Sequence, residues 1–159
     1  MKLSTRGRYA TRALLDLARH QKAGPIPLKD IARRQEISLH YLEHLVTPLI
    51  MAGIIRTSRG PAGGVQLVKP PHQIKLSEVI RLVEGSIVPV ECVVNPEVCS
   101  RSELCVTREI WAELERAMSA VLESTTLQDL VERQETKERV TGLDIKETGK
   151  GEFNGEANQ

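Results

Sequence analysis

The segment Ser38–Leu45, SLHYLEHL, predicts the start of an amphipathic helix, around which the fold can be worked out. Ser38 is a favourable N-cap, because its hydroxyl can accept a hydrogen bond from a free N–H of the first turn. Apolar residues at helical spacing predict one buried stripe: Leu39, Leu42, Leu45, Val46 and Leu49. Polar residues face away from that stripe: Ser38, His40, Tyr41, Glu43 and His44. Such side chains suit DNA base edges and phosphates, although a solvated surface has the same composition.

Two helices are predicted before this one. Residues 3–20 combine an apolar face with an arginine-rich one that includes Arg6, and a Gly-Pro-containing segment follows them. Leu28–Gln35 predicts a short second helix, and a brief turn then leads to Ser38. Two short helices joined by a tight turn, the second with a polar exposed start, are typical of a helix-turn-helix.

A β-hairpin is predicted after the third helix. Gly53 suits the C-terminal end of that helix, and two β-prone runs, 54–58 and 65–68, flank a glycine-rich connector over 59–64. A hairpin in this position is called a wing, and its Arg59 could enter a minor groove while Gly60 lets the backbone approach phosphates. A nucleotide-binding loop is disfavoured, because the glycine spacing matches neither common phosphate-binding motif.

Charge divides the chain in two. Residues 1–70 hold 12 Lys and Arg against 4 Asp and Glu, a net charge of +8, whereas the remainder carries −7. A basic half joined to an acidic half indicates a polyanion-binding module carried by a second region, although uneven composition alone could produce the split. No apolar run approaches the ~20 residues of a membrane span, and the N-terminus lacks a signal-peptide pattern, so a cytoplasmic location is expected.

The second half predicts a different arrangement. Leu76–Glu84 predicts a short helix, and residues 86–106 lose all periodicity. Thr107 is expected to cap a long helix ending near Leu122, and a last helix is expected over Leu127–Gln134. The chain becomes polar and rich in Gly, Glu and Lys after Glu135, which predicts disorder over most of it.

All three cysteines lie in the aperiodic segment: Cys92, Cys99 and Cys105. Disulfides are disfavoured by the reducing cytosol and by the odd number. Thiolates on one loop could instead hold an iron–sulfur cluster or zinc, or could be reactive thiols. Zinc is disfavoured because close C-x2-C pairs are absent, and the wide spacing favours a cluster.

Four motifs, in order, resemble the Rrf-type winged-helix transcriptional regulators, above all those that bind an iron–sulfur cluster. They are TRGRYA (5–10), ISLHYLE (37–43), RGPAGG (59–64) and the cysteine loop before a Trp-containing helix. The likeness covers roughly residues 1–134. It implies a homodimer joined through the helix at about 107–122, and a cluster on Cys92, Cys99 and Cys105. By position, it implies DNA contacts from Arg6, Ser38, His40, Tyr41, Glu43, His44, Arg56, Arg59 and Gly60.

Two departures from the family pattern concern the cluster. The gap between the first two cysteines is one residue longer than usual, and Arg108 stands where a histidine is the expected fourth ligand. Arginine stays protonated and cannot ligate iron, so the fourth ligand is unknown, and the cluster could be [2Fe–2S] or [4Fe–4S].

The sequence therefore predicts a mainly α protein with a small β-hairpin wing. The expected parts are a DNA-binding domain over 1–85, a cluster loop over 86–106, dimerisation helices over 107–138 and a disordered tail over 139–159. The expected function is cluster-controlled transcription regulation on a double-stranded DNA operator, with no membrane partner. One alternative is a cluster-free regulator that responds to a protein partner or to thiol oxidation. An iron–sulfur enzyme is disfavoured, because no nucleophile–base set, paired carboxylates or cofactor loop is present.

Overall fold

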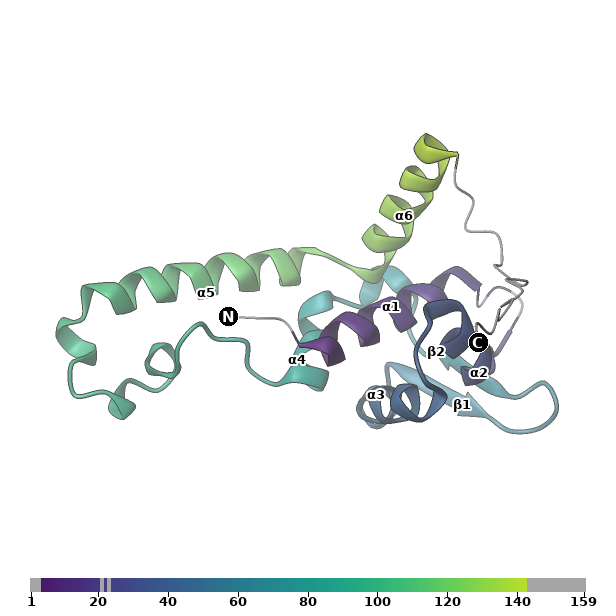
Figure 1. The fold of residues 1–159 in the computed structure, drawn as a ribbon, viewed down its shortest axis with the longest axis horizontal. Coiled ribbons are helices and arrows are strands. Elements are labelled where there is room, and N and C mark those ends of the chain that lie inside the picture. The colour runs from purple at the N-terminus through teal and green to yellow at the C-terminus, as the bar shows by residue number, and fades with distance from the viewer. Residues whose placement is uncertain (1–3, 21, 23, 143–159) are drawn as a thin grey trace, which may run out of the picture.

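The protein is described by a computed structural model that covers residues 4–20, 22 and 24–142. Its helices are α1 (Thr5–His20), α2 (Leu28–Gln35), α3 (Leu39–Met51), α4 (Leu76–Glu84), α5 (Val106–Ser124) and α6 (Leu127–Thr141). The strands are β1 (Ile55–Ser58) and β2 (Gly64–Leu67), and short 3₁₀ turns are η2 (Pro71–Gln73), η3 (Glu91–Val93), η4 (Pro96–Val98) and η5 (Ser102–Leu104). A mostly helical chain with one antiparallel hairpin confirms the predicted fold class (Figure 1).

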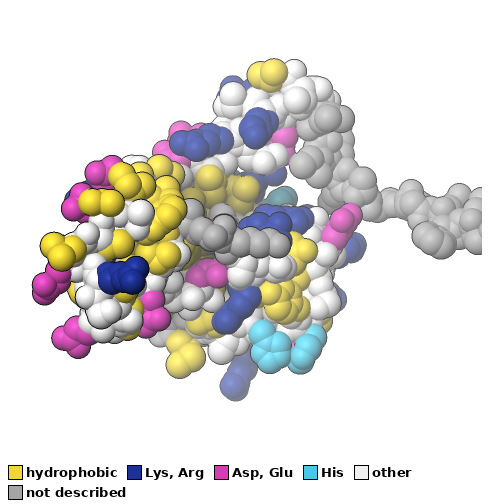
Figure 2. All heavy atoms as spheres, turned by 60° about the vertical axis from the view of Figure 1, so that its left-hand side comes forward, with side chains coloured by type: hydrophobic (Ala, Val, Ile, Leu, Met, Phe, Trp, Pro, Cys, Tyr) yellow, Lys and Arg dark blue, Asp and Glu magenta, His cyan; other side chains and the backbone are white. Residues whose placement is uncertain are grey.

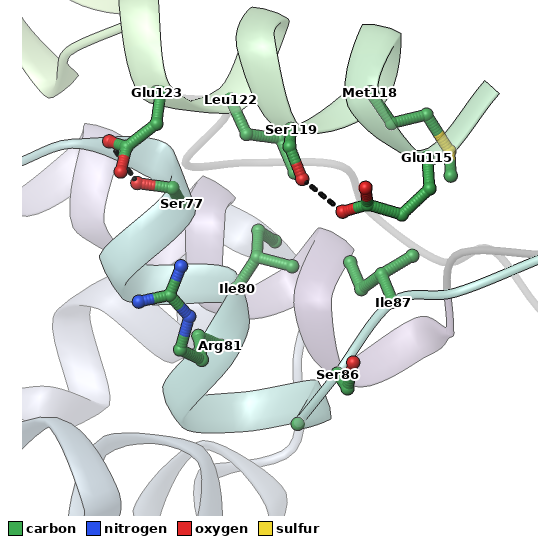
Figure 3. A pocket seen from close by; sticks show the side chains of 11 residues that line it. Ser77, Ile80, Arg81, Ser86, Ile87, Glu115, Met118, Ser119, Leu122 and Glu123 are labelled. Atoms are coloured by element: carbon green, nitrogen blue, oxygen red, sulfur yellow. Dashed lines mark hydrogen bonds between the residues drawn. The ribbon is translucent and has the colours of Figure 1, made fainter. Parts of the chain in front are cut away.

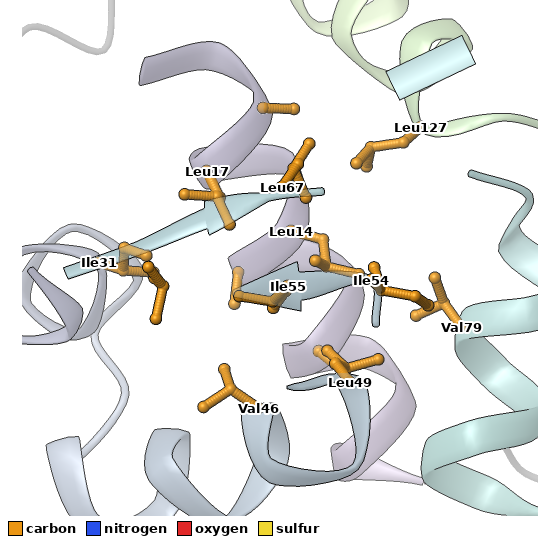
Figure 4. Close-up of a cluster of buried hydrophobic side chains, with 14 of the residues drawn as sticks. Leu14, Leu17, Ile31, Val46, Leu49, Ile54, Ile55, Leu67, Val79 and Leu127 are labelled. Carbon is orange, nitrogen blue, oxygen red and sulfur yellow. The ribbon is translucent and has the colours of Figure 1, made fainter. Parts of the chain in front are cut away.

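The hydrophobic core lies where α1 meets α2, α3, α4, the hairpin and the start of α6 (Figure 4). The predicted buried face of α1 is confirmed, since Ala10, Ala13, Leu14, Leu17 and Ala18 are all buried. Leu127 at the start of α6 is also fully buried in this cluster. The last helix therefore packs on the N-terminal half of the chain, although it follows the long helix in sequence.

A buried ion pair fixes α1 against α2. The Asp16 carboxylate, 3% exposed, accepts hydrogen bonds from both Nε and Nη2 of Arg34, the shortest from Nη2 at 2.6 Å, and another from the Gln35 amide at 3.1 Å. A buried carboxylate requires such partners, because its unpaired charge would be costly away from water. The network holds the first helix of the helix-turn-helix in place.

The turn between α2 and α3 depends on two residues. Glu36 adopts a left-handed conformation, with φ 54° and ψ 44°, which reverses the chain after α2. Ser38 then caps α3 as predicted, with its hydroxyl accepting from the Tyr41 N–H at 3.3 Å. Leu39 was expected in the buried stripe but is 41% exposed. It lies in the first turn, one turn before the fully buried Leu42, where fewer neighbours cover it.

The wing is attached to the α1–α2 linker. Ile26 and Val65 form an antiparallel bridge in which each backbone N–H donates to the other's carbonyl at 2.8 Å. A Cβ on Gly64 would lie 2.3 Å from the Ile26 backbone carbon, so only glycine fits this close approach. Gly60 instead has φ 105° and open space around it.

The second half extends away from this core. Figure 1 shows α5 leaving the body as a long projecting helix, and none of its residues is buried. The expected Thr107 cap is wrong, because α5 starts at Val106 and Thr107 lies inside its first turn. Helix α6 runs to Thr141 rather than Gln134, so the first residues of the predicted disordered tail are helical. The rest of that tail, residues 143–159, lies outside the described residues.

No helix in the described part of the chain is long and apolar enough to cross a membrane.

Candidate nucleic-acid interface and cysteine loop

The N-terminal half of α3 carries an exposed polar face. Ser38, His40, Glu43 and His44 are all exposed, while Leu42, Leu45, Val46 and Leu49 are buried beneath them. The Ser38 cap satisfies one free N–H of the first turn. The result is a rigid helix that presents side chains able to donate to and accept from base edges.

Tyr41 does not lie fully on this exposed face. Its ring is half-buried and packs edge-on against Tyr9 of α1, with centroids 6.1 Å apart and planes at 83°. Arg12 places its guanidinium carbon 5.5 Å from the Tyr9 ring centroid. The expectation that Tyr41 faces away from the apolar stripe is therefore only partly met, since its ring joins the edge of the core.

The two candidate residues of the wing turn are exposed, and so is Arg56 on β1. Arg59 and Gly60 lie at the tip of the hairpin, where β1 turns back toward β2. Arg56 pairs with Gln66 in the strand register, and its guanidinium lies against the Gln66 side-chain amide, whose oxygen can accept from it once the amide is turned over. Arg6 is exposed in the first turn of α1. These cations are accessible for phosphate contacts.

The cysteine loop runs through η3, η4 and η5, and its three thiols are each half-buried. Cys105 Sγ lies 3.1 Å from the Thr107 hydroxyl. The hydrogen bond from this hydroxyl, and next that from the Arg108 backbone N–H, lowers the pKa of the Cys105 thiol from its usual value. Among the described residues, no group of three or more His, Cys, Asp or Glu side chains is placed to hold a metal ion.

Arg108 ties this loop to the projecting helix. Its Nε donates to the Cys92 carbonyl oxygen at 2.7 Å, a contact across 16 residues that joins the start of the loop to the first turns of α5. The residue at the expected position of the fourth ligand is thus a hydrogen-bond donor to the backbone of the first cysteine. The sequence excluded Arg108 as an iron ligand, but it contained no signal for this bond.

A shallow pocket of about 110 Å³ lies between α4 and α5 (Figure 3). Glu123 accepts from the Ser77 hydroxyl at 2.9 Å and forms an ion pair with Lys75 at 3.3 Å. The Ser77 hydrogen bond, and next the interaction with Lys75, lowers the pKa of Glu123. These contacts, which sequence reasoning missed, connect the projecting helix to α4 and to the residue before it.

The other side of α5 is apolar and exposed. Figure 2 shows hydrophobic side chains gathered along the projecting part of the molecule. The large exposed ones in this region are Leu104, Val106, Ile110, Trp111 and Val121, with Leu104 at 92%. A contiguous apolar surface of this kind marks an interaction site more often than a solvated face.

Comparisons with known proteins agree with this architecture. The Rrf2 family profile, described as an iron-dependent transcriptional regulator, matches residues 3–133. Protein rrf2 of Nitratidesulfovibrio vulgaris is 44% identical over 131 residues, covering 82% of this chain and 87% of the relative. CymR, the global cysteine regulator of B. subtilis, superposes with a TM-score of 0.72 at 39% identity, over 84% of this chain and 98% of that one. IscR of T. potens gives 0.71 at 36% identity, over 86% and 90%.

Proposed function

The chain belongs to the Rrf2 family of transcriptional regulators, and we propose that it binds operator DNA as a homodimer whose affinity is set by an iron–sulfur cluster on Cys92, Cys99 and Cys105. Its relatives are regulators rather than enzymes. The observation that carries the proposal is the position of the cysteines. All three lie in the one loop that joins the DNA-binding half to the projecting helix α5.

The DNA-binding part of the proposal is supported by charge and geometry. The first 70 residues carry a net charge of +8, and the exposed face of α3 adjoins a wing that bears Arg59. Helix α3 would enter the major groove, and the wing would contact the minor groove or the backbone. Affinity for any duplex should fall steeply with salt, because each phosphate contact releases counterions.

The dimer is supported by the exposed apolar side of α5. Val106, Ile110 and Val121 recur at helical spacing and remain uncovered in the single chain. A second copy packed on this side would bury them and set the distance between two α3 helices. Two-fold symmetric regulators place such helices about one helical turn of DNA apart, or a small multiple of it, on a pseudo-palindromic site.

The donor set suits an iron–sulfur cluster. Three thiols on one loop are the ligands that such clusters use, and the lowered pKa of Cys105 favours its ligating thiolate form. When bound, the cluster would make the conformation of the loop depend on iron and redox state. The described residues contain no preassembled metal site, so cluster binding would require the loop to close around the group.

A second candidate keeps the fold and omits the cluster. The Arg108 hydrogen bond to the Cys92 carbonyl already holds the loop against α5 without a metal. The structural likeness to CymR, titled a global cysteine regulator, favours a form that responds to a partner or to thiol chemistry. The two candidates share the DNA-binding surface and differ in what the cysteines do.

Purification without oxygen tests the proposal. We expect a coloured protein with iron and sulfide in comparable amounts, and a change in operator affinity when the cluster is removed. Each of Cys92→Ser, Cys99→Ser and Cys105→Ser should lose iron, whereas Ser100→Ala in the same loop should not. A colourless, iron-free dimer whose affinity changes on thiol oxidation would favour the second candidate. Failure of the purified protein to retain any DNA duplex at low salt would overturn the DNA-binding assignment itself.

A further inference from the structure

Two histidines lie side by side on the exposed face of α3. The Nε2 atoms of His40 and His44 are 3.2 Å apart, and the ring centroids are separated by 4.5 Å with planes at 85°. Both residues are exposed, and Figure 2 shows histidine side chains adjoining one another at the surface. Among the described residues, each of these two imidazole rings forms its hydrogen bond with the other ring.

The separation of the two nitrogens matches that of adjacent ligands on one metal ion. Zinc–imidazole bonds are about 2.1 Å long, so two nitrogens at a tetrahedral angle would be roughly 3.4 Å apart, and at a right angle roughly 3.0 Å. The observed 3.2 Å lies between these values. Metal binding requires both imidazoles to be protonated at Nδ1, so that an ion replaces the hydrogen bond between the two Nε2 atoms.

The helix places both side chains on one face before any ion arrives. Residues four apart share one face of a helix, and α3 is fixed at its start by the Ser38 cap and beneath by the buried Leu42 and Leu45. Neutral imidazole is a preferred ligand of zinc, copper and nickel ions. The described residues place no third His, Cys, Asp or Glu side chain to complete the set, so solvent has to fill the remaining positions.

We propose that His40 and His44 bind one divalent transition-metal ion through their Nε2 atoms, with water completing its coordination. The site is separate from the cysteine loop, because both histidines belong to α3 of the DNA-binding half. It is exposed, and the ion should therefore exchange readily with solution.

A consequence for regulation rests on the proposed function. If α3 reads the major groove, an ion on this face occupies surface that would otherwise contact bases, and it also adds positive charge near phosphates. Metal and duplex would then alter each other's affinity by the same factor, because coupling between two binding equilibria is reciprocal.

Calorimetric titration with Ni²⁺ alone tests the site. The chain should carry Cys92→Ser, Cys99→Ser and Cys105→Ser, so that thiolates do not compete for the ion. We expect one ion per chain, and affinity weaker by about a hundredfold in His40→Gln or His44→Gln, since a two-ligand site gains from linkage of its ligands. His72→Gln, which removes an exposed histidine elsewhere, should leave affinity unchanged. Equal affinity in His44→Gln and its parent would overturn the site.

Proton NMR of the wild-type chain provides a second test that does not depend on the cysteine variants. Paramagnetic Ni²⁺ should broaden the ring signals of both His40 and His44 at the same metal concentration. Broadening of one ring without the other would overturn shared coordination. A Ni²⁺-induced rise in melting temperature should accompany binding and be absent in His44→Gln, because an ion that binds the folded state stabilises it.

Duplex retention with and without saturating Ni²⁺ separates this inference from the proposed function. A Ni²⁺-dependent change in retention by the wild-type chain, together with histidine-dependent Ni²⁺ binding in the titration, supports both. Failure of the metal-free protein to retain duplex, with the Ni²⁺ titration unchanged, would overturn the DNA assignment and leave the metal site supported. Normal retention with no histidine-dependent Ni²⁺ binding would overturn the metal site and leave the DNA assignment intact.

Discussion

Glu84 Oε1 accepts a hydrogen bond from the backbone N–H of Gly7 at 2.7 Å, so the last residue of α4 caps the first turn of α1. The same oxygen accepts from the Ser4 hydroxyl. A carboxylate at a helix N-terminus satisfies N–H groups that have no partner within the helix and interacts favourably with the helix dipole. The contact therefore joins the first helix of the DNA-binding half to the helix that precedes the cysteine loop.

Removing this carboxylate should loosen the contact between α1 and α4. We expect Glu84→Ala to lower the free energy of unfolding by about 1–2 kcal/mol, because it removes a charged acceptor from two donors. Urea denaturation followed by circular dichroism measures the loss. Glu97→Ala, in an exposed part of the cysteine loop, is the matched control and should change stability little.

A double-mutant cycle with Gly7 sharpens that test. A Cβ on Gly7 would lie 2.6 Å from Glu84 Oε1, so Gly7→Ala must displace the carboxylate. In the Glu84→Ala background the same change should be less destabilising by roughly 1 kcal/mol, since it then displaces no carboxylate. Additive effects of the two substitutions would contradict a direct contact.

The sequence revealed the helical part of this fold because periodicity is a local property. The spacing of Ala13, Leu14 and Leu17 in α1 is visible without any knowledge of the neighbours. The bond from Gly7 to Glu84 spans 77 residues and involves a glycine N–H and one of many glutamates. No pattern in the chain distinguishes that glutamate from the others.

The candidate sites likewise combine local features that the sequence predicts with tertiary contacts that it does not. The capping role of Ser38 could be predicted, because a cap acts within three residues. The half-buried position of Tyr41 depends on Tyr9 of another helix, and the role of Arg108 depends on where the loop places the Cys92 carbonyl. These are tertiary contacts, and residue type alone does not specify them.

Gly64 should be essential for attachment of the wing. A Cβ there would overlap the Ile26 backbone, so Gly64→Ala must break the bridge between Ile26 and Val65 or move the hairpin. We expect a loss of about 2–4 kcal/mol and faster amide exchange at Val65, measured by denaturation and by hydrogen exchange. Gly60→Ala, which has open space but φ 105°, should cost about 1 kcal/mol and leave exchange at Val65 unchanged. Similar exchange at Val65 in both variants would contradict the packing argument.

The start of α6 should fray in acid. Asp129 and Thr126 form a capping box, and the hydrogen bond from the Thr126 hydroxyl, at 2.7 Å, lowers the pKa of Asp129. A folded-state pKa below the unfolded value gives stability that is present above the unfolded value, about 3.9, and is lost as pH falls through the folded value. Circular dichroism should show wild type losing part of its helical signal as pH falls. This acid-dependent loss should be absent in Asp129→Asn and should persist in Thr126→Ser. Identical acid profiles of wild type and Asp129→Asn would exclude this cap as the cause.

The exposed side of α5 should control assembly. Ile110 is 57% exposed in the single chain, and a charge there would be buried by a second copy packed on that side. We expect Ile110→Glu to be monomeric in sedimentation velocity and to bind a two-half-site operator about a hundredfold more weakly, since linked binding is lost. Arg116→Ala, on a different side of the helix, should remain dimeric. A dimeric Ile110→Glu would place the interface elsewhere.

Glu43 should influence which sequence is bound more than how tightly DNA is bound. Its carboxylate is exposed on α3, where it can accept from cytosine N4 but is repelled by phosphates and by other acceptors. We expect Glu43→Ala to keep operator affinity within a few fold of wild type. Discrimination against substituted base pairs should fall by roughly tenfold, because one base contact contributes about 1–3 kcal/mol of discrimination. Arg59→Ala is the contrasting variant, because loss of a phosphate or minor-groove cation should weaken binding to all duplexes and reduce the salt slope by about one unit. Competition binding with a library of singly substituted operators measures both quantities. A uniform loss of affinity across that library in Glu43→Ala would show that the carboxylate does not read a base.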